Sequence, residues 1–408
     1  MRKRYTKIGC LVEKNQSILV LGPRGTGKSY YINYLLESKS EKIVIDLLDT
    51  ELYSRFLKNP GQLSKIVRYK LESHKNVIVF IDEVQKVPAL LDEVHRLIET
   101  IGDRVVFILT GSSARKLRKS HANLLAGRAI YIPFFPFSLM EIDLVKGIDK
   151  AMQYGTLPKA FLDNDVFLIE NYLRTYTHIY LKEEIQQESL TRNIDVFSRF
   201  LEFAAFENGH PINYSKIAKQ LGVSLKTVQG HYQILEDTLI VTKIPAWTFS
   251  IRKQMIQMPK YYFFDNGVLN SLTGELKTEL KESSYRFGRL FENLVVNEII
   301  RYNELMDLDY NLYHYRTNHG SEIDLILQKN IKYPPIAVEI KSTATPGGVD
   351  VKQLNKFKDE FPDSECYVLC RVPYPYEENG VTFLPFVDGI KQVFGGGRGS
   401  KESVGRGE

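Results

Sequence analysis

Short, continuous apolar runs alternate with longer amphipathic or charged stretches over roughly the first third of the chain. An uninterrupted apolar run is typical of a strand buried on both faces of a parallel sheet, and amphipathic stretches are typical of the covering helices. We predict strands at the apolar runs 18–21, 42–47, 76–81, 105–110 and 129–132. The stretches between them that favour helices are 30–36, 51–74 and 84–101. This alternation predicts an α/β fold built on a parallel sheet.

The first apolar run opens into the P-loop pattern Gly22-x-x-x-x-Gly27-Lys28-Ser29. A loop that wraps polyphosphate turns its backbone N–H groups inward, and side chains at the glycine positions would block the approach. Lys28 is expected to reach the β- and γ-phosphates, and the Ser29 hydroxyl to bind Mg²⁺. The pattern therefore predicts that ATP or GTP is bound by Gly22, Pro23, Arg24, Gly25, Thr26, Gly27, Lys28 and Ser29.

Two acids, Asp82 and Glu83, follow the third apolar run. A buried parallel strand would deliver both carboxylates to the sheet edge where ligands bind. We expect Asp82 to hold the Mg²⁺ shell and Glu83 to polarise the attacking water, although two acids after a strand can also form a solvated turn. Thr110, or the serines at 112 and 113, would sense the γ-phosphate from the next strand, unless the serines only cap a helix.

The composition is that of a globular protein, with 408 residues, 43% hydrophobic and 25% charged, which is enough for several domains. A net charge of +5 is compatible with nucleic acid without being evidence for it. The three cysteines show no paired metal spacing and fit a reducing compartment. No signal peptide or membrane span is evident, so we expect a cytoplasmic location with no membrane contact.

Several longer stretches narrow the fold further: IDEVQKVPALL, LTGSS, LLAGRAIYIPFFPFSLMEI and YGTLPKAF. They resemble a bacterial and archaeal family of AAA+ ATPases whose C-terminal half is a domain of unknown function with restriction-endonuclease-like character. The resemblance reaches to about Phe386. It implies ATP and Mg²⁺ as cofactors and a homo-oligomer in which Arg128 reaches a neighbour's nucleotide. The alternative for Arg128 is an ordinary salt bridge.

The resemblance and the apolar pattern together divide the chain into an AAA+ core at 1–135, a helical lid at 136–194 and a winged-helix domain at 195–265. A PD-(D/E)xK nuclease-like domain at 266–390 and a flexible tail at 391–408 follow. A basic helix is expected near 114–121, for contact with DNA or a neighbour, or as a solvated face.

The winged-helix prediction rests on two short helical patterns, at 212–223 and 224–235, joined by a glycine turn. The runs 239–241 and 244–249 would pair as the wing. Side chains expected on the exposed face of the second helix, where they could contact DNA, are Lys226, Thr227, Gln229, His231 and Gln233. Many winged helices instead contact proteins, so a protein partner is the alternative.

The last candidate site combines Asp324, in a run at 322–327, with Glu339 and Lys341, in a run at 336–341. If these two strands are neighbours, the three side chains converge. This set resembles the PD-(D/E)xK nuclease core, in which carboxylates hold Mg²⁺ for phosphodiester cleavage and a lysine helps to position water. Glu292, on a helix predicted at 287–302, would complete the metal shell. The plainer alternatives are a solvated strand face and a same-face ion pair between Glu339 and Lys341.

We therefore expect an AAA+ protein that binds and hydrolyses ATP, binds DNA, and cleaves it through a Mg²⁺-dependent nuclease-like domain. The alternative is an ATP-switched regulatory ATPase that binds DNA or a protein while its nuclease-like domain is inactive.

Overall fold

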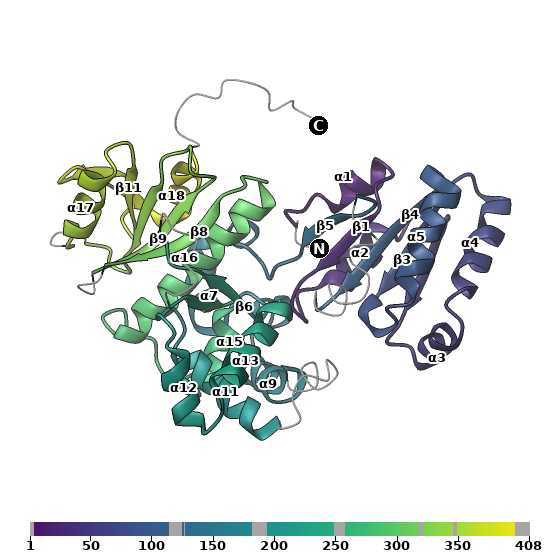
Figure 1. The fold of residues 1–408 in the computed structure, drawn as a ribbon, viewed down its shortest axis with the longest axis horizontal. Helices are drawn as coiled ribbons and strands as arrows, with labels where there is room; N and C mark the ends of the chain where they lie inside the picture. The colour runs from purple at the N-terminus through teal and green to yellow at the C-terminus, as the bar shows by residue number, and fades with distance from the viewer. Residues whose placement is uncertain are drawn as a thin grey trace. The chain divides into compact units, whose positions relative to one another are not determined.

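The computed structural model describes residues 4–113, 125, 127–181, 194–248, 258–317, 321–345 and 349–395 (Figure 1). The chain forms two compact units. The first unit contains Met1–Ile142, Tyr154–Leu201 and Ser215–Val241, and the second contains Asp143–Gln153, Glu202–Tyr214 and Thr242–Glu408. The predicted basic helix, most of the helical pattern at 181–190 and most of the tail lie outside the described residues.

A five-stranded parallel sheet is the centre of the first unit, with the strand order β2-β3-β4-β1-β5. Each strand corresponds to one predicted apolar run. Their bounds are β1 (Ile18–Leu21), β2 (Lys42–Asp46), β3 (Val77–Asp82), β4 (Val105–Gly111) and β5 (Ile130–Pro133). Because β1 lies between β4 and β5, and β3 is the other neighbour of β4, the carboxyl ends of β1, β3 and β4 meet at one edge.

Helices cover both faces of this sheet. Val77, Val79 and Ile81 of β3 pack with the helices on one face, while Ile78 and Phe80 pack in a separate core on the other. This alternation gives a three-layer sandwich. The first face carries α3 (Thr50–Lys58), α4 (Gln62–Ser73) and α5 (Leu90–Ile101), and the second carries α1 (Ile8–Glu13) and α2 (Lys28–Leu35). The predicted helix at 84–101 is split into α5 and a short 3-10 turn, η1 (Val84–Lys86).

The remainder of the first unit is helical. Asp165 caps α9 by accepting hydrogen bonds from the backbone of Phe167 and Leu168, as an N-terminal aspartate does. The helix then passes directly into η4, a five-residue π-helical turn. The helices in this part are α8 (Pro158–Leu162), α9 (Val166–Thr175), η4 (Tyr176–Tyr180), α12 (Tyr214–Leu221) and α13 (Leu225–Asp237), with the start of α11 (Ile194–Phe206).

The α12 and α13 helices lie where the winged-helix pattern predicts them, and Ser224 caps α13 by accepting from the Thr227 N–H. For one residue of the expected DNA-facing set, His231, the predicted exposure is wrong. His231 is buried, with its ring 4.9 Å from those of both Phe197 and Phe200. It packs in an aromatic core and cannot contact DNA from there.

The predicted pairing of the wing is also wrong. The structure pairs β6 (Val241–Ile244) with β7 (Lys260–Phe263), not 239–241 with 244–249. The segment after β6 instead follows the larger sheet of the second unit, because the Trp247 N–H donates to the His314 carbonyl at 2.6 Å. The indole packs against Phe357. A winged-helix domain as a whole stays a prediction.

A six-stranded mixed sheet is the centre of the second unit, with the order β12-β13-β11-β10-β9-β8. Its bounds are β8 (Asn311–Arg316), β9 (Glu322–Gln328), β10 (Ile336–Ile340), β11 (Glu365–Cys370), β12 (Tyr376–Glu378) and β13 (Val381–Pro385). The helices are α7 (Leu144–Tyr154), α15 (Asn266–Leu272), α16 (Tyr285–Leu305), α17 (Lys352–Glu360) and α18 (Phe386–Val393). The last helix runs three residues beyond 390, where the tail was predicted to begin.

Opposite faces of this sheet contact different helices. Val368 and Cys370 share a core with Leu354 and Phe357 of α17. Leu369, which points the other way, meets α18 at Gly389, where an added Cβ would lie 2.7 Å from the Leu369 side chain. Among the described residues, no helix is both long and apolar enough to cross a membrane.

Candidate functional site

The P-loop joins β1 to α2, and its glycines are required by its geometry. A Cβ on Gly22 would lie 1.9 Å from the Phe134 carbonyl oxygen. Gly25 and Gly27 have φ angles of 81° and 90°, a conformation that side chains disfavour. Since Gly27 is the N-cap of α2, the free N–H groups of the first helical turn face the loop.

Lys28 is buried, with only 5% of its surface exposed. Its Nζ donates to the carbonyls of Gly22 at 2.7 Å and Pro23 at 3.1 Å. The Thr26 hydroxyl also donates to the Pro23 carbonyl, at 2.9 Å. Ser29 follows in the first turn of α2 and is partly exposed. The ammonium and this hydroxyl therefore lie at the loop where the sequence predicts phosphate and Mg²⁺.

The predicted acids lie at the same edge of the sheet. The Thr110 hydroxyl, at the end of β4, donates to the Asp82 carboxylate. The Glu83 N–H donates to the Thr110 hydroxyl at 3.2 Å, and Glu83 has a left-handed φ of 57°. Thr110 thus links both acids, as a residue that senses events at the nucleotide would need to do.

Sequence reasoning missed Gln85, which lies in the η1 turn. Its Nε2 donates to the Glu83 carboxylate and to the Ser112 hydroxyl, the latter at 3.1 Å. Ser112 in turn donates to Glu83 at 3.4 Å. The only feature of the local sequence that could have indicated a role for Gln85 is its position two residues after Glu83. Gln85 and Ser112 hold the carboxylate that was predicted to polarise water.

A cavity of about 490 Å³ opens beside the P-loop residues Thr26 and Gly27. Arg4 forms part of its wall, with its guanidinium 4.5 Å from the Phe134 ring centroid and 4.9 Å from that of Phe137. Arg4 also pairs with Glu141 at 3.1 Å. Further lining residues are Tyr30, Tyr31, Pro158, Lys159, Leu162 and Asp163. A mostly apolar wall next to a phosphate-binding loop suits a nucleobase.

Helical residues far along the chain close over the P-loop. The Tyr176 hydroxyl, on the η4 turn, donates to the Arg24 carbonyl at 2.9 Å. Tyr172 lies one turn earlier, and the Lys159 ammonium lies 5.0 Å from its ring centroid. Pro158 contacts the loop at Gly27, where an added Cβ would lie 3.8 Å from its ring. π-helical turns often occur at functional sites.

Arg128 forms an ion pair with Glu99. The side chains are 35% and 49% exposed, so the pair is open to water. This is the ordinary salt bridge that the sequence left open as the alternative. A contact between Arg128 and a neighbouring protomer stays a prediction.

In the second unit, β9 and β10 are antiparallel neighbours, which was the condition for the second predicted site to form. The pairing of Leu325 with Val338 brings Asp324 next to Glu339 across the two strands. The Ile340 N–H donates to Asp324 Oδ2 at 2.8 Å. Lys341 Nζ donates to Glu339 Oε1 at 2.5 Å. The structure therefore brings the three predicted side chains together.

Glu292 joins this group from α16. Its Oε1 accepts from the Tyr262 hydroxyl at 2.7 Å and lies 3.8 Å from Lys260 Nζ. Lys260, which the sequence did not single out, also pairs with Glu322. We call Glu292, Glu322, Asp324, Glu339, Lys260 and Lys341 the carboxylate–lysine cluster.

The carboxylates of this cluster repel one another in a poorly hydrated environment. Burial, and then the charge of Asp324, raise the pKa of Glu292 to about 7 and that of Glu339 to about 8. The Glu339 Oε2 atom is buried and has no hydrogen-bond partner among the described residues. Among the described residues, no group of three or more His, Cys, Asp or Glu side chains is arranged to hold a metal ion. The orphaned Glu339 oxygen beside Asp324 nevertheless suits a hard cation such as Mg²⁺, which prefers carboxylate oxygens.

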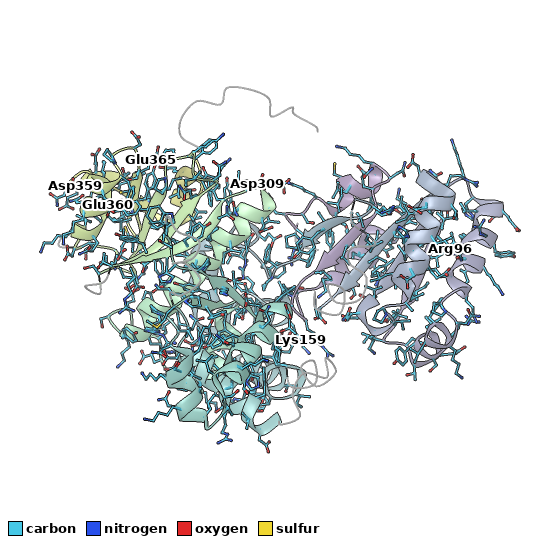
Figure 2. All side chains as sticks on the ribbon, in the orientation of Figure 1. Arg96, Lys159, Asp309, Asp359, Glu360 and Glu365 are labelled. Carbon is cyan, nitrogen blue, oxygen red and sulfur yellow. The ribbon has the colours of Figure 1, made fainter. Side chains whose placement is uncertain are left out.

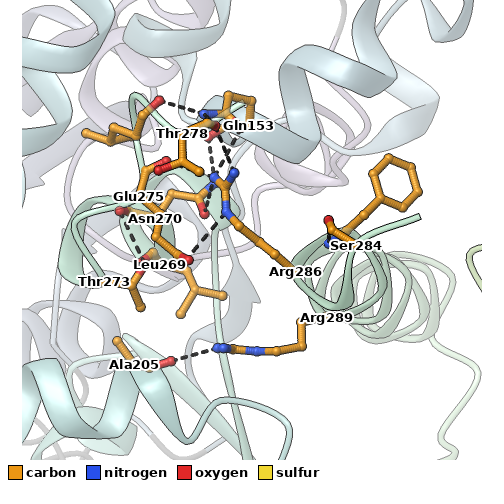
Figure 3. Close-up of polar contacts among 12 residues, drawn as sticks. Gln153, Ala205, Leu269, Asn270, Thr273, Glu275, Thr278, Ser284, Arg286 and Arg289 are labelled. Atoms are coloured by element: carbon orange, nitrogen blue, oxygen red, sulfur yellow. Dashed lines mark hydrogen bonds and ion pairs between the residues drawn. The ribbon is translucent and has the colours of Figure 1, made fainter. Parts of the chain in front are cut away.

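Two arginines fix the first turns of α16, which carries Glu292. Arg286 donates to Asn270 at 3.0 Å and to the carbonyls of Glu275 and Thr278 at 2.9 Å (Figure 3). Arg289 donates to the Ala205 carbonyl at 3.2 Å. A cavity of about 250 Å³ beside this helix is lined by Arg289, His210, Lys341 and Glu292, among others. Cationic side chains therefore stand next to the carboxylates, as an approaching phosphate would require.

Three family models match successive parts of the chain. Residues 14–143 match the AAA domain. Residues 145–279 and 287–388 match two domains of unknown function, DUF8612 and DUF4143. The AAA match covers the whole parallel sheet and the P-loop, so this part of the first unit has an AAA-type α/β fold.

Similarity over most of the chain extends to proteins that are described as uncharacterized. An uncharacterized protein of Mycobacterium tuberculosis is 23% identical over 330 residues, which are 81% of this chain and 71% of the relative. An uncharacterized protein of Methanocaldococcus jannaschii is 24% identical over 357 residues, covering 81% of this chain and 76% of the relative. The descriptions of these relatives name no activity that could be compared with the site described above.

Solved structures resemble the chain only loosely. The Aeropyrum pernix ORC1 protein in complex with DNA has a TM-score of 0.31 at 13% identity, over 66% of this chain and 91% of that chain. A structure of katanin self-assembly has a TM-score of 0.21 at 18% identity, over 43% of this chain and 52% of that chain. Similarity at this level carries no inference about fold or function.

Proposed function

We propose that the chain binds ATP with Mg²⁺ and hydrolyses it at the edge of the parallel sheet. Lys28 would hold the β- and γ-phosphates, while Ser29 and Asp82 would orient the metal. Glu83, fixed by Gln85 and Ser112, would polarise water. The support is that the P-loop, both acids and Thr110 come from the ends of three neighbouring strands.

We propose further that the second unit binds DNA and cleaves it. The observation that carries this proposal is the convergence of Asp324, Glu339 and Lys341 on two neighbouring strands. A bound Mg²⁺ would polarise a phosphodiester and lower the pKa of its water. Lys341 is 39% exposed in its side chain, so its ammonium can meet a phosphate oxygen, whereas Glu339, at 13%, faces inward.

A homo-oligomer in which Arg128 acts on a neighbour's ATP remains part of the proposal. The ion pair with Glu99 would have to open for this, at little cost, because both side chains are exposed to water and exposed ion pairs contribute little to stability. A protein partner is proposed as an alternative ligand for the α12–α13 region, since Lys226 is left as the one cation of the expected DNA-facing set after His231 is placed in the core.

The second candidate function is an ATP-switched regulator whose nuclease-like unit does not cleave. The favouring observation is that Lys260 and Lys341 already neutralise part of the acidic charge, so the cluster holds together through its own ion pairs.

One experiment separates these functions. ATP turnover and cleavage of linear, circular and single-stranded DNA are measured with Mg²⁺ or Mn²⁺ on wild type, Lys28→Ala and Asp324→Ala. The matched control is Asp359→Ala, an exposed acid on α17 (Figure 2). We expect Asp324→Ala to lose cleavage and keep ATP turnover, and Lys28→Ala to lose turnover. Cleavage absent from wild type with every metal and substrate would refute the nuclease and leave the regulator. Absent turnover would refute the ATPase.

A further inference from the structure

Lys260 is almost completely buried, with 2% of its surface exposed. Its ammonium pairs with Glu322 and lies 3.8 Å from Glu292 Oε1. Lysines are rarely buried to this extent unless they are paired. Burial alone would lower the pKa of Lys260, but the charges of Glu292, Asp324 and Glu322 raise it above the ordinary value. The side chain is therefore a buried positive charge inside an acidic cluster.

The strand that delivers this charge is fixed independently of the cluster. Lys260 begins β7, which pairs with β6, and the Ile212 N–H donates to the carbonyl of Pro259, just before Lys260, at 2.8 Å. The Gly209 N–H donates to the Tyr261 carbonyl at 2.9 Å. Lys260 is thus held in place from both sides of the strand, so its position does not depend on a ligand.

The carboxylates of the cluster fall into two groups, which differ in whether a lysine or hydroxyl already faces them. In the first group, Glu292 and Glu322 both face the Lys260 ammonium, and Glu292 also accepts from Tyr262. In the second group, Glu339 keeps one buried oxygen without a partner, next to Asp324. Counted formally, four carboxylates against two ammonium groups leave a charge of −2, which one divalent cation neutralises.

We propose that the Lys260 ammonium is a resident cation for Glu292 and Glu322, so that the cluster takes one divalent metal ion, at Asp324 and Glu339, and not two. This inference rests on the metal-dependent site proposed above. It reassigns Glu292 from direct metal ligand to partner of Lys260. Where two-metal sites place a second ion to neutralise charge at the reacting phosphate, this chain places a lysine.

The test counts bound ions. Mn²⁺ bound per chain is measured on the full chain without nucleotide for wild type, Lys260→Met, Lys260→Arg and Glu339→Gln, so that any ion at the P-loop is common to all four. We expect Lys260→Met to bind one ion more than wild type, because two carboxylates lose their cation. Lys260→Arg, which keeps the charge, should match wild type, and Glu339→Gln should bind one ion fewer.

Stability gives a second readout that cleavage assays do not supply. Removal of the Lys260 charge leaves Glu292 and Glu322, two partly buried carboxylates, without their cation, which is destabilising. Lys260→Met should therefore melt well below wild type in EDTA and recover most of that loss in Mn²⁺, while Lys260→Arg gains no more from Mn²⁺ than wild type does. If the Met variant folds only with Mn²⁺, its ions are counted on protein prepared in Mn²⁺ and then desalted.

The possible failures are distinct. An ion count in Lys260→Met equal to wild type, or a Met variant that stays unfolded even in Mn²⁺, overturns the role of Lys260. If Glu339→Gln binds two Mn²⁺ ions fewer than wild type, the assignment of a single metal ion to the cluster is wrong. A count unaffected by Glu339→Gln overturns the metal site itself, and with it the proposed nuclease.

Discussion

His231 provides a test of the helical part of the first unit, because it is a titratable group in an aromatic core. Its ring packs against those of Phe197 and Phe200, and burial lowers its pKa from 6.5 to about 4. Below pH 6.5, His231 becomes protonated in the unfolded chain but stays neutral in the folded chain. The free energy of unfolding therefore decreases as the pH falls from 6.5 towards 4. A pKa difference of about 2.5 corresponds to about 3 kcal/mol of unfolding free energy.

The matched variant is His231→Phe, which keeps an aromatic ring in the core and removes the titration. Urea unfolding is followed by circular dichroism between pH 7.5 and pH 4.5 for wild type and variant. Acid-induced loss should be smaller in the variant by up to about 3 kcal/mol, and DNA affinity at pH 7.5 should be unchanged. Equal losses in the two proteins, or a DNA affinity that falls in the variant, would refute the placement of His231 in the core.

Three further predictions concern the nucleotide site. Gly22→Ala should abolish binding of a fluorescent ATP analogue, because the new Cβ would meet the Phe134 carbonyl oxygen at 1.9 Å and no side-chain rotation relieves a backbone clash; wild-type affinity would contradict the loop geometry. Gln85→Ala should lower the ATP turnover number by roughly 10-fold or more at unchanged affinity, because the Glu83 carboxylate loses its amide donor; unchanged turnover in a steady-state assay would remove Gln85 from the site. Tyr176→Phe should cost about 1 kcal/mol of unfolding free energy through the lost hydroxyl contact with the P-loop, and equal urea midpoints would show that this contact contributes nothing.

The central strands β3 and β4 of the first sheet were predictable because both of their faces are buried. All six residues of β3 and all seven of β4 are buried, so nearly every position is apolar and the run is continuous. The position of Asp82 was predictable for a related reason. Asp82 is the last residue of such a run, and the end of a buried parallel strand lies at the carboxyl edge of the sheet.

Partners distant in sequence could not be predicted from local pattern. Arg4 lies on the rings of Phe134 and Phe137, about 130 residues later, and nothing around Arg4 indicates this. The partner of Lys260 is also distant in sequence, because Glu322 lies on another strand of the second unit. In both cases a charged residue has a buried role that only the three-dimensional pairing creates.

The two errors in the winged-helix region have the same physical origin. His231 was assigned to the exposed face because a polar residue on an amphipathic helix usually belongs there. The aromatic residues that enclose it come from α11, outside the pattern of its own helix. The wing was paired with the nearest alternating segment, but β6 pairs with β7, whose start lies 16 residues after the end of β6.

The order in which the compact units occur along the chain has a consequence for biosynthesis. The AAA family match ends at residue 143, yet the first unit also needs Tyr154–Leu201 and Ser215–Val241. A nascent chain that has just released residue 143 from the ribosome has its P-loop but not Pro158 or Tyr176, which close over that loop. The cavity beside the P-loop is therefore complete only after the chain has emerged to about Tyr176. Expression of residues 1–143 alone should give a soluble sheet at best, with a truncated nucleotide cavity.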